Sequence, residues 1–379
     1  MKKACAWCLL WLVLCLPAMG QGESEAEGVA FWVNGDAVYQ AEIDAMMATL
    51  TESMAQLGLD TSDATVLATI KSVAQQQIIE DRLLTRDMTE QGMYEWTAED
   101  ESAVAASAQA AFDALLADYT AYYAGQEESG EGGDAAAAQR AQEALETAGY
   151  TLGFFENYYR NALASERYEA WLMRGEAPVT DEAVETAYQQ RVAESEGLYA
   201  QDVEAFETAL ASGQEVWYRP AGYRAVLQIL LSAQGDTEAE KLASVEEKTD
   251  EIYARLEAGE AFESLIAEYG EDSAFDDPEF ARTGYQVHPD SVLWEESFVQ
   301  AVFSDALARP GDVSQPLVFG DNVHILYYLA DVEAGAVALT DDLREALRAA
   351  LYGEQVDARL EERLDSLLAG ADIVFAESE

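Results

Sequence analysis

The sequence predicts an α+β protein. Mostly helical segments at both ends of the chain, with a small β-hairpin near the N-terminus, enclose an inserted domain with an antiparallel sheet flanked by helices. Three observations support this fold class. Residues 21–177 contain no proline and are rich in Ala, Leu, Glu and Gln. Five of the 7 prolines lie between Pro220 and Pro316, which marks where the helical architecture is interrupted. A Leu-rich helical pattern then returns over residues 340–368.

The first 20 residues are predicted to be a secretory signal peptide. Lys2 and Lys3 precede an apolar run over residues 4–16, and Ala18 and Gly20 supply the small residues of a cleavage site. The run is shorter than the ~20 apolar residues of a membrane-spanning helix. An uncleaved anchor is the alternative, and only in that case do we expect membrane association. The sequence therefore predicts an exported protein, located in the cell envelope or secreted.

Composition excludes several classes of function. All three cysteines lie within the leader, so the rest of the chain has no thiol for a disulfide, for catalysis or for metal binding. With only 2 histidines besides, we expect no metal site and no cofactor. The net charge of −52 excludes nucleic-acid binding, because phosphate contacts require clustered Lys and Arg. An acidic surface of this kind serves either solubility or the attraction of basic polypeptides.

Residues 29–177 are predicted to form an N-terminal helical domain that follows a flexible acidic tether over residues 21–28. Apolar residues flank Asn34-Gly35, which is the strongest short signal for a β-hairpin. Helix-starting residues and apolar periodicity then predict five helices, near residues 41–57, 62–90, 97–124, 135–147 and 151–174. The Gly- and Glu-rich break at residues 125–134 is predicted to be an exposed loop.

Residues 178–218 are predicted to be a helical arm, and residues 334–379 a C-terminal helix with a short strand. The arm begins with an acidic first helical turn after Thr180, and its second helical segment covers residues 202–211. Leucines recur on one side of the C-terminal helix, and such an apolar stripe must be buried. We therefore expect this helix to fold back onto the N-terminal helices, and residues 371–375 to add a strand beside the hairpin.

The inserted domain, residues 219–333, has the size of one small α+β domain. Alternating and helix-periodic patterns predict the order strand, helix, loops, short helix, turn and strand. These elements lie near residues 223–231, 245–266, 269–289, 294–307, 309–312 and 323–329.

Six short segments of this insert carry a resemblance to a known family. They are Arg224 to Leu230, Leu256 to Phe262, Tyr269 to Ser273, Phe298 to Phe303, Pro310 to Pro316 and Val323 to Leu326. In this order they resemble the parvulin (rotamase) family of peptidyl-prolyl cis-trans isomerases. The hairpin Phe31 to Ile43 and the segment Gln77 to Leu84 are similar to the N-terminal region of the SurA and PrsA type of exported chaperone. The resemblance implies an exported foldase whose partners are unfolded or proline-containing polypeptides.

The resemblance also implies a candidate catalytic site. Rotation about an X–Pro bond needs no nucleophile, metal or cofactor, and parvulin-type sites use two histidines on neighbouring strands, a Cys or Asp, and an apolar floor. His324 matches the histidine of the closing strand, and Asp272 matches the Cys-or-Asp position. Gln228 stands where the other histidine is expected. Glutamine hydrogen-bonds but does not titrate, which implies a weakened isomerase.

An apolar floor for the prolyl ring is expected from Phe298, from Trp294 one helical turn before it, and from Phe303. Two smaller departures from the family pattern are Phe319, where a threonine is common, and Asn322, where the family turns on glycine. Because Asn tolerates a positive φ better than other non-glycine residues, we expect the turn to persist.

Each of these residues also has a plainer interpretation. His324 fits a core histidine of an alternating strand, Gln228 a satisfied polar residue, and Asp272 one acid among 73 Asp and Glu. Phe298 and Phe303 fit an ordinary core. Two other functions therefore stay open from sequence: a non-catalytic chaperone whose parvulin-like domain is a vestigial peptide clamp, and a secreted acidic structural protein without a client.

Overall fold

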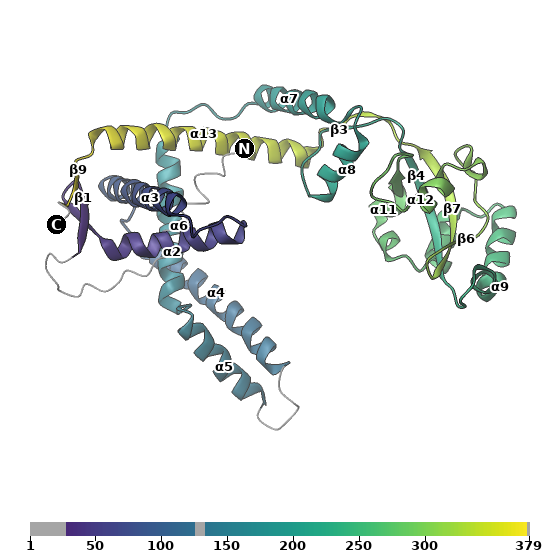
Figure 1. Ribbon diagram of the computed structural model, residues 1–379, viewed down its shortest axis with the longest axis horizontal. Helices are drawn as coiled ribbons and strands as arrows, with labels where there is room; N and C mark the ends of the chain where they lie inside the picture. Colours follow the sequence, from purple (N-terminus) through teal and green to yellow (C-terminus); the bar gives the residue numbers. More distant parts are fainter. Residues whose placement is uncertain (1–27, 126–132, 377–379) are drawn as a thin grey trace. The chain divides into compact units, whose positions relative to one another are not determined.

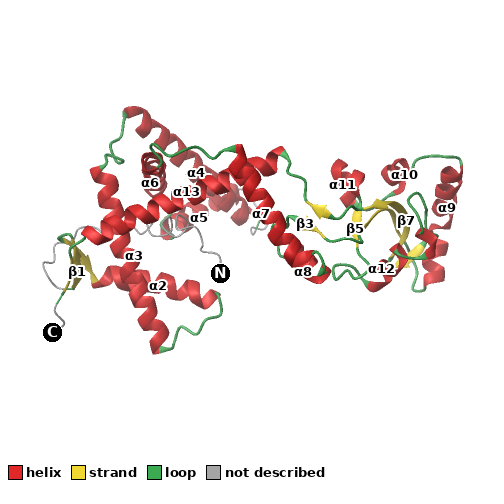
Figure 2. Ribbon diagram, turned by 90° about the horizontal axis from the view of Figure 1, so that it is seen from above, coloured by secondary structure: helices red, strands yellow, loops and turns green. Residues whose placement is uncertain are grey.

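A computed structural model describes residues 28–125 and 133–376. The predicted signal peptide, nearly all of the predicted tether and most of the predicted loop at 125–134 lie outside these residues. The chain divides into two compact units, residues 1–178 with 350–379, and residues 179–349. The described residues form many helices and three small antiparallel sheets (Figure 2), which confirms the predicted α+β class. Among them, no helix is both long and apolar enough to span a membrane.

The first unit contains a three-stranded sheet that joins both ends of the described chain (Figure 1). It consists of β1 (Val29–Val33), β2 (Asp36–Tyr39) and β9 (Ile373–Phe375), in the order β2-β1-β9. Asn34 (φ 52°) and Gly35 (φ 90°) form the hairpin turn, as their positive φ preference predicts. The Asn34 side-chain oxygen also accepts a hydrogen bond from the N–H of Asp372 at 2.8 Å. The strand expected at residues 371–375 thus pairs with the hairpin.

Five helices follow, and their observed ends lie within two residues of the predicted ones. They are α2 (Gln40–Gln56), α3 (Ala64–Glu90), α4 (Ala98–Ala124), α5 (Gly133–Thr147) and α6 (Leu152–Leu172). Local capping fixes several starts. The Asp63 carboxylate accepts hydrogen bonds from the first N–H groups of α3, and Thr97 forms a capping box with Asp100 at α4.

The C-terminal helix α13 (Asp341–Gly370) contributes its last two thirds to the first unit. Its Leu360 lies in a buried cluster with residues of α3 and α6, among them Leu84 and Tyr168. Arg363 forms a bidentate ion pair with Asp87 of α3, which is 2% exposed and also accepts a hydrogen bond from the Tyr168 hydroxyl at 2.6 Å. The leucine stripe therefore packs on the N-terminal helices.

The second unit begins with the predicted arm, which forms α7 (Asp181–Tyr199) and α8 (Val203–Ala211). The first turns of α13 also belong to this unit, and Arg348 pairs there with Asp181 at 2.7 Å. A short antiparallel pair, β3 (Tyr218–Arg219) with β8 (Gly335–Ala336), lies where the chain enters and leaves the insert.

The insert is built on a four-stranded antiparallel sheet in the order β5-β4-β7-β6. Its strands are β4 (Arg224–Ser232), β5 (Tyr285–Val287), β6 (Leu317–Phe319) and β7 (Asn322–Asp331). The two strands predicted at 223–231 and 323–329 lie side by side as β4 and β7, with Gln228 opposite Leu326 and Leu230 opposite His324. This adjacency is the feature on which the candidate site depends.

Alternation along β4 and β7 gives the sheet two different faces. One face packs on α9 (Glu238–Glu257) and α10 (Phe262–Tyr269) through a core that includes Leu227, Ile229 and Ile325. The other face contributes Val226 and Leu326 to a second core with α12 (Glu296–Val302). Figure 1 shows α9 and α11 (Pro278–Thr283) on opposite sides of the β4–β7 pair.

One local prediction in the insert is wrong, and another holds for a different reason. The helix expected over residues 294–307 begins only at Glu296 and ends at Val302, and a separate short 3-10 turn, η2 (Asp305–Leu307), follows. Trp294 therefore precedes the helix. The turn before the last strand persists as expected, but its positive φ lies at Gly320 (59°), whereas Asn322 opens β7 opposite Phe319. Glycine two residues earlier removes the need for a left-handed asparagine.

Candidate functional site

Gln228, Asp272 and His324 converge on one face of the sheet. The Gln228 side-chain nitrogen Nε2 donates a hydrogen bond to Asp272 Oδ2 at 2.6 Å, and His324 Nδ1 lies 2.8 Å from Gln228 Oε1. The register explains this contact: His324 stands opposite Leu230, so it is a diagonal cross-strand neighbour of Gln228 on the same face. Gln228 and His324 are 6% and 8% exposed, so both polar groups need partners inside the protein.

Asp272 is the acceptor at the end of this network. It caps the 3-10 turn η1 (Ser273–Asp276), and its Oδ1 accepts the N–H of Ala274 at 3.0 Å. Its Oδ2 accepts the hydroxyl of Tyr285 at 2.8 Å in addition to Gln228. Burial, together with this carboxylate, raises the pKa of the Tyr285 hydroxyl above its usual value. At neutral pH the Tyr285 hydroxyl is therefore protonated and donates its hydrogen bond.

These contacts fix the proton positions in the network. A carboxylate only accepts hydrogen bonds, so the amide nitrogen of Gln228 must face Asp272 and its oxygen must face His324. Nδ1 of His324 therefore carries a hydrogen. Burial lowers the pKa of His324 below its usual value, against a smaller opposing effect of the Asp272 charge. At neutral pH the ring is thus uncharged, with a lone pair on Nε2.

Aromatic rings complete a closed circuit around the network. Ring centroids lie 5.1 Å apart for His324 and Phe319, 5.7 Å for Phe319 and Phe298, 5.2 Å for Phe298 and Trp294, and 5.1 Å for Trp294 and Tyr285. Because the Tyr285 hydroxyl donates a hydrogen bond to Asp272, these ring contacts and the hydrogen bonds among Asp272, Gln228 and His324 form one closed circuit. Trp294 and Phe319 are only half buried. The site thus combines a fixed polar network with an aromatic wall.

Phe303 lies outside this circuit. The guanidinium group of Arg224 stacks on Phe303 at 4.5 Å and on Tyr328 at 4.6 Å. Arg224 also donates to the carbonyl oxygens of Val302 and Leu307, each at 3.1 Å. These contacts tie the end of α12 to the start of β4. Phe303 thus packs against the same core as Trp294 and Phe298, but its ring contacts Arg224.

Two residues of the site were not singled out as functional from the sequence. Tyr285 lies on the three-residue strand β5, which is too short for a periodic pattern, although it directly follows Gly284 in a loop-rich stretch. In the sequence, Phe319 is only a departure from the family pattern, yet in the structure its ring contacts His324 edge-on. Among the described residues, no cluster of His, Cys, Asp and Glu is arranged to hold a metal ion.

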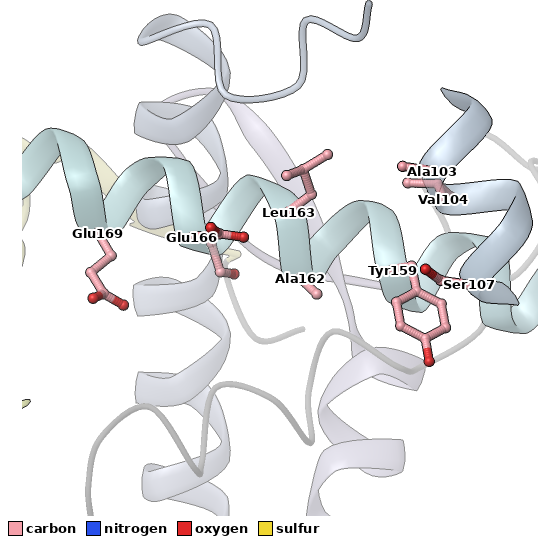
Figure 3. Close-up of a pocket in the computed structure, with 9 residues that line it drawn as sticks. Ala103, Val104, Ser107, Tyr159, Ala162, Leu163, Glu166 and Glu169 are labelled. Carbon is pink, nitrogen blue, oxygen red and sulfur yellow. The ribbon is translucent and has the colours of Figure 1, made fainter. Parts of the chain in front are cut away.

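A second candidate site lies in the first unit. Helices α4 and α6 border an open groove of about 480 Å³. Its lining is mixed: Val104 and Leu163 contribute apolar side chains, Tyr159 contributes a phenol ring, and Glu166 and Glu169 add carboxylates (Figure 3). The groove therefore offers both apolar surface and negative charge to a bound molecule.

Comparisons with known proteins return weak likenesses. No family model and no curated protein sequence matches the chain. A structure from work on two SurA-like chaperones of Campylobacter jejuni, PEB4 and Cj1289, covers 93% of this chain and 100% of its own, with a TM-score of 0.38 and 9% identity. PrsA from Bacillus subtilis covers 93% and 94%, with a TM-score of 0.23 and 17% identity. The foldase protein PrsA from Lactococcus lactis covers 93% and 96%, with a TM-score of 0.24 and 13% identity. We infer neither fold nor function from likenesses of this strength.

Proposed function

We propose that the second unit catalyses cis-trans rotation about X–Pro bonds in unfolded polypeptides, and that the chain is an exported folding factor. One observation carries the catalytic half of the proposal. The closed circuit of His324, Gln228, Asp272 and Tyr285 with three aromatic rings provides a rigid, partly exposed wall that suits a prolyl ring.

The physical basis is the change in polarity along the reaction. The planar amide owes its barrier of ~18–20 kcal/mol to resonance, which also separates charge between oxygen and nitrogen. The twisted transition state has lost that resonance and is less polar. An environment of aromatic rings that excludes water therefore disfavours the planar form relative to the twisted one. Trp294, Phe298 and Phe319 offer such rings to one side of a bound X–Pro amide.

The polar network has a supporting part in this scheme. Because His324 is neutral and donates through Nδ1 to Gln228, it brings no positive charge that would stabilise the planar, charge-separated amide. Asp272 holds Gln228 on one side and Tyr285 on the other. The network thereby fixes His324 beside Phe319 and Tyr285 beside Trp294, and Phe319 and Trp294 are the two ends of the aromatic wall.

A protease-coupled assay with a proline-containing peptide tests the proposal. Trp294→Ala removes part of the wall, and we expect it to lower kcat/KM by about tenfold or more, the size of one lost aromatic contact. Leu198→Ala is the control, since Leu198 is 64% exposed on α7 of the same unit, and its kcat/KM should stay within about twofold of the parent. Phe303 remains an expected member of the apolar floor, and Phe303→Leu tests it in the same assay. A folded parent protein with no rate above background would remove the catalytic half.

Position 228 separates the enzyme from the vestigial clamp. In an isomerase weakened by glutamine, Gln228→His restores the family residue, and we expect a gain in rate. In a peptide clamp without catalysis, the same substitution leaves the assay flat. His324→Ala should then suppress client aggregation as well as the parent does.

We further propose that the groove between α4 and α6 holds client segments that carry both apolar and basic residues. The mixed lining by Leu163, Glu166 and Glu169 supports this choice. Leu163→Ser should weaken the suppression of aggregation of a basic unfolded client, and Glu166→Gln with Glu169→Gln should reduce its salt dependence. Leu57→Ser is the control, because Leu57 is 79% exposed in the same unit and does not line the groove. Failure of the parent to bind any unfolded polypeptide would favour the structural-protein alternative.

A further inference from the structure

A buried carboxylate on the helical arm holds the loop that leads into the aromatic wall. Glu207 of α8 is 1% exposed. Its Oε1 accepts the hydroxyl of Tyr223 at 2.9 Å. Its Oε2 accepts three donors from the segment 291–293: the Ser291 hydroxyl at 2.8 Å, the N–H of Val292 at 2.7 Å and the N–H of Leu293 at 3.2 Å. The next residue along the chain is Trp294.

The carboxylate makes this arrangement costly without its donors. An ionised group removed from water must be compensated by hydrogen bonds, and four neutral donors provide that compensation here. Hydrogen bonds to a charged acceptor are stronger than neutral ones. Glu207 therefore binds the loop more tightly than a neutral side chain in the same place. If the loop contacts were lost, the carboxylate would remain buried without most of its hydrogen-bond donors.

The loop has little else to hold it at this point. The side chains of Val292 and Leu293 are 53% and 48% exposed, so their burial contributes little to fixing the segment. At its other end, His288 is buried: its Nε2 lies 3.0 Å from the carbonyl oxygen of Ala221, and its Nδ1 accepts the N–H of Asp290 at 3.0 Å. The segment 288–293 is thus anchored by polar contacts at both ends.

We propose that Glu207 is a positioning residue for the candidate site, acting through the segment 291–293 on Trp294. In this proposal the arm that carries α8 helps to position the candidate site, in addition to linking the first unit to the insert. The consequence for catalysis rests on the proposed isomerase function, whereas the consequence for the position of Trp294 does not.

The test uses the full chain labelled with 5-fluorotryptophan, in which ¹⁹F resonances report each indole and Trp294→Phe assigns one of them. Glu207→Leu keeps the volume but removes the acceptor, so the Trp294 resonance should shift or broaden while that of Trp171 in the first unit stays unchanged. We expect kcat/KM for a proline-containing peptide to fall about tenfold. Glu207→Gln retains an acceptor oxygen for the loop but loses the charge, so both readouts should lie between those of Glu207→Leu and the parent. Glu204→Gln, an exposed acid on the same helix, is the control.

Each outcome decides the inference. An unmoved Trp294 resonance in folded Glu207→Leu would overturn it, and so would a shifted resonance with the kcat/KM of the parent. If Glu207→Leu does not fold, Ser291→Ala removes one of the three loop donors, and an unmoved Trp294 resonance there has the same meaning. If the parent shows no isomerase activity, the proposed function fails, and the resonance alone decides whether Glu207 positions Trp294.

Discussion

Replacing Gln228 by leucine removes the central link between His324 and Asp272 without a large change in volume. In the parent, the hydrogen bonds predict opposite tautomers for the two histidines. His324 carries its hydrogen on Nδ1, whereas His288 accepts the Asp290 N–H at Nδ1 and must carry its hydrogen on Nε2 to donate to the Ala221 carbonyl. In Gln228→Leu the His324 ring loses the acceptor that selects its tautomer, so we expect its hydrogen to redistribute toward Nε2, with His288 unchanged.

The energetic cost follows from burial. His324 is 8% exposed, and whichever tautomer it adopts, its Nδ1 faces an apolar side chain without a partner. An unsatisfied buried polar group costs about 1–3 kcal/mol. Asp272 keeps Tyr285 and the N–H of Ala274 as donors and is only half buried, so water replaces its lost bond at little cost. We therefore expect the second unit to lose about 1–3 kcal/mol of unfolding free energy.

Nitrogen NMR of ¹⁵N-histidine-labelled protein measures both effects, because the sequence holds only 2 histidines and both lie in the second unit. Protonated and unprotonated ring nitrogens resonate far apart, and loss of the native signals in urea follows the unfolding of this unit alone. Gln286→Leu on the neighbouring strand β5 is the control, with an expected loss below about 0.5 kcal/mol. An Nε2–H tautomer of His324 in the parent would refute the assigned orientation of the Gln228 amide. Unchanged stability in Gln228→Leu would refute the burial argument.

Three further predictions concern stability and pH. Arg363→Met leaves the buried Asp87 carboxylate without its ion pair and should lower the unfolding free energy of the first unit by about 3–5 kcal/mol, with recovery in the double variant that also carries Asp87→Leu; urea unfolding measures both. Gly284→Ala places a Cβ 2.4 Å from the Val226 carbonyl oxygen at a φ of 64°, so urea unfolding should show a loss of more than about 1 kcal/mol. Burial lowers the pKa of His324 below its usual 6.5, so the unfolded chain binds more protons between these two values. In that window stability should rise with pH, and above pH 6.5 both stability and kcat/KM should be flat as far as this residue is concerned.

Sequence patterns predicted best what is decided locally. The helices begin near Asp63 and Thr97 because these side chains accept hydrogen bonds from backbone N–H groups two and three residues further along the chain. The turn at Asn34 follows from its own backbone preference. The pairing of β4 with β7 is non-local, but alternation combined with the family resemblance was sufficient to place Gln228 and His324 on adjacent strands.

The parts that were missed depend on partners distant in sequence. Glu207 contacts residues 84 to 86 positions further along the chain, and no local pattern indicates such a contact. One signal was nevertheless present: α8 is otherwise rich in apolar residues, and an acid placed one turn after Val203 falls on its apolar side. The spacing of Trp294 from Phe298 predicts a helix that includes both, although α12 begins only at Glu296.

The pairing of β1 with β9 affects the order in which the two units of this chain can fold. Phe31 of β1 lies opposite Phe375 of β9, so the edge strand of the hairpin pairs with a segment far later in the sequence. In a chain delivered from its N-terminus, that edge stays unpaired until β9 has emerged, whereas both strands of the β4–β7 pair are available about forty residues sooner. Closing so long a loop is slow relative to local contacts. The second unit therefore has time to fold before β9 pairs with β1 and completes the sheet of the first unit.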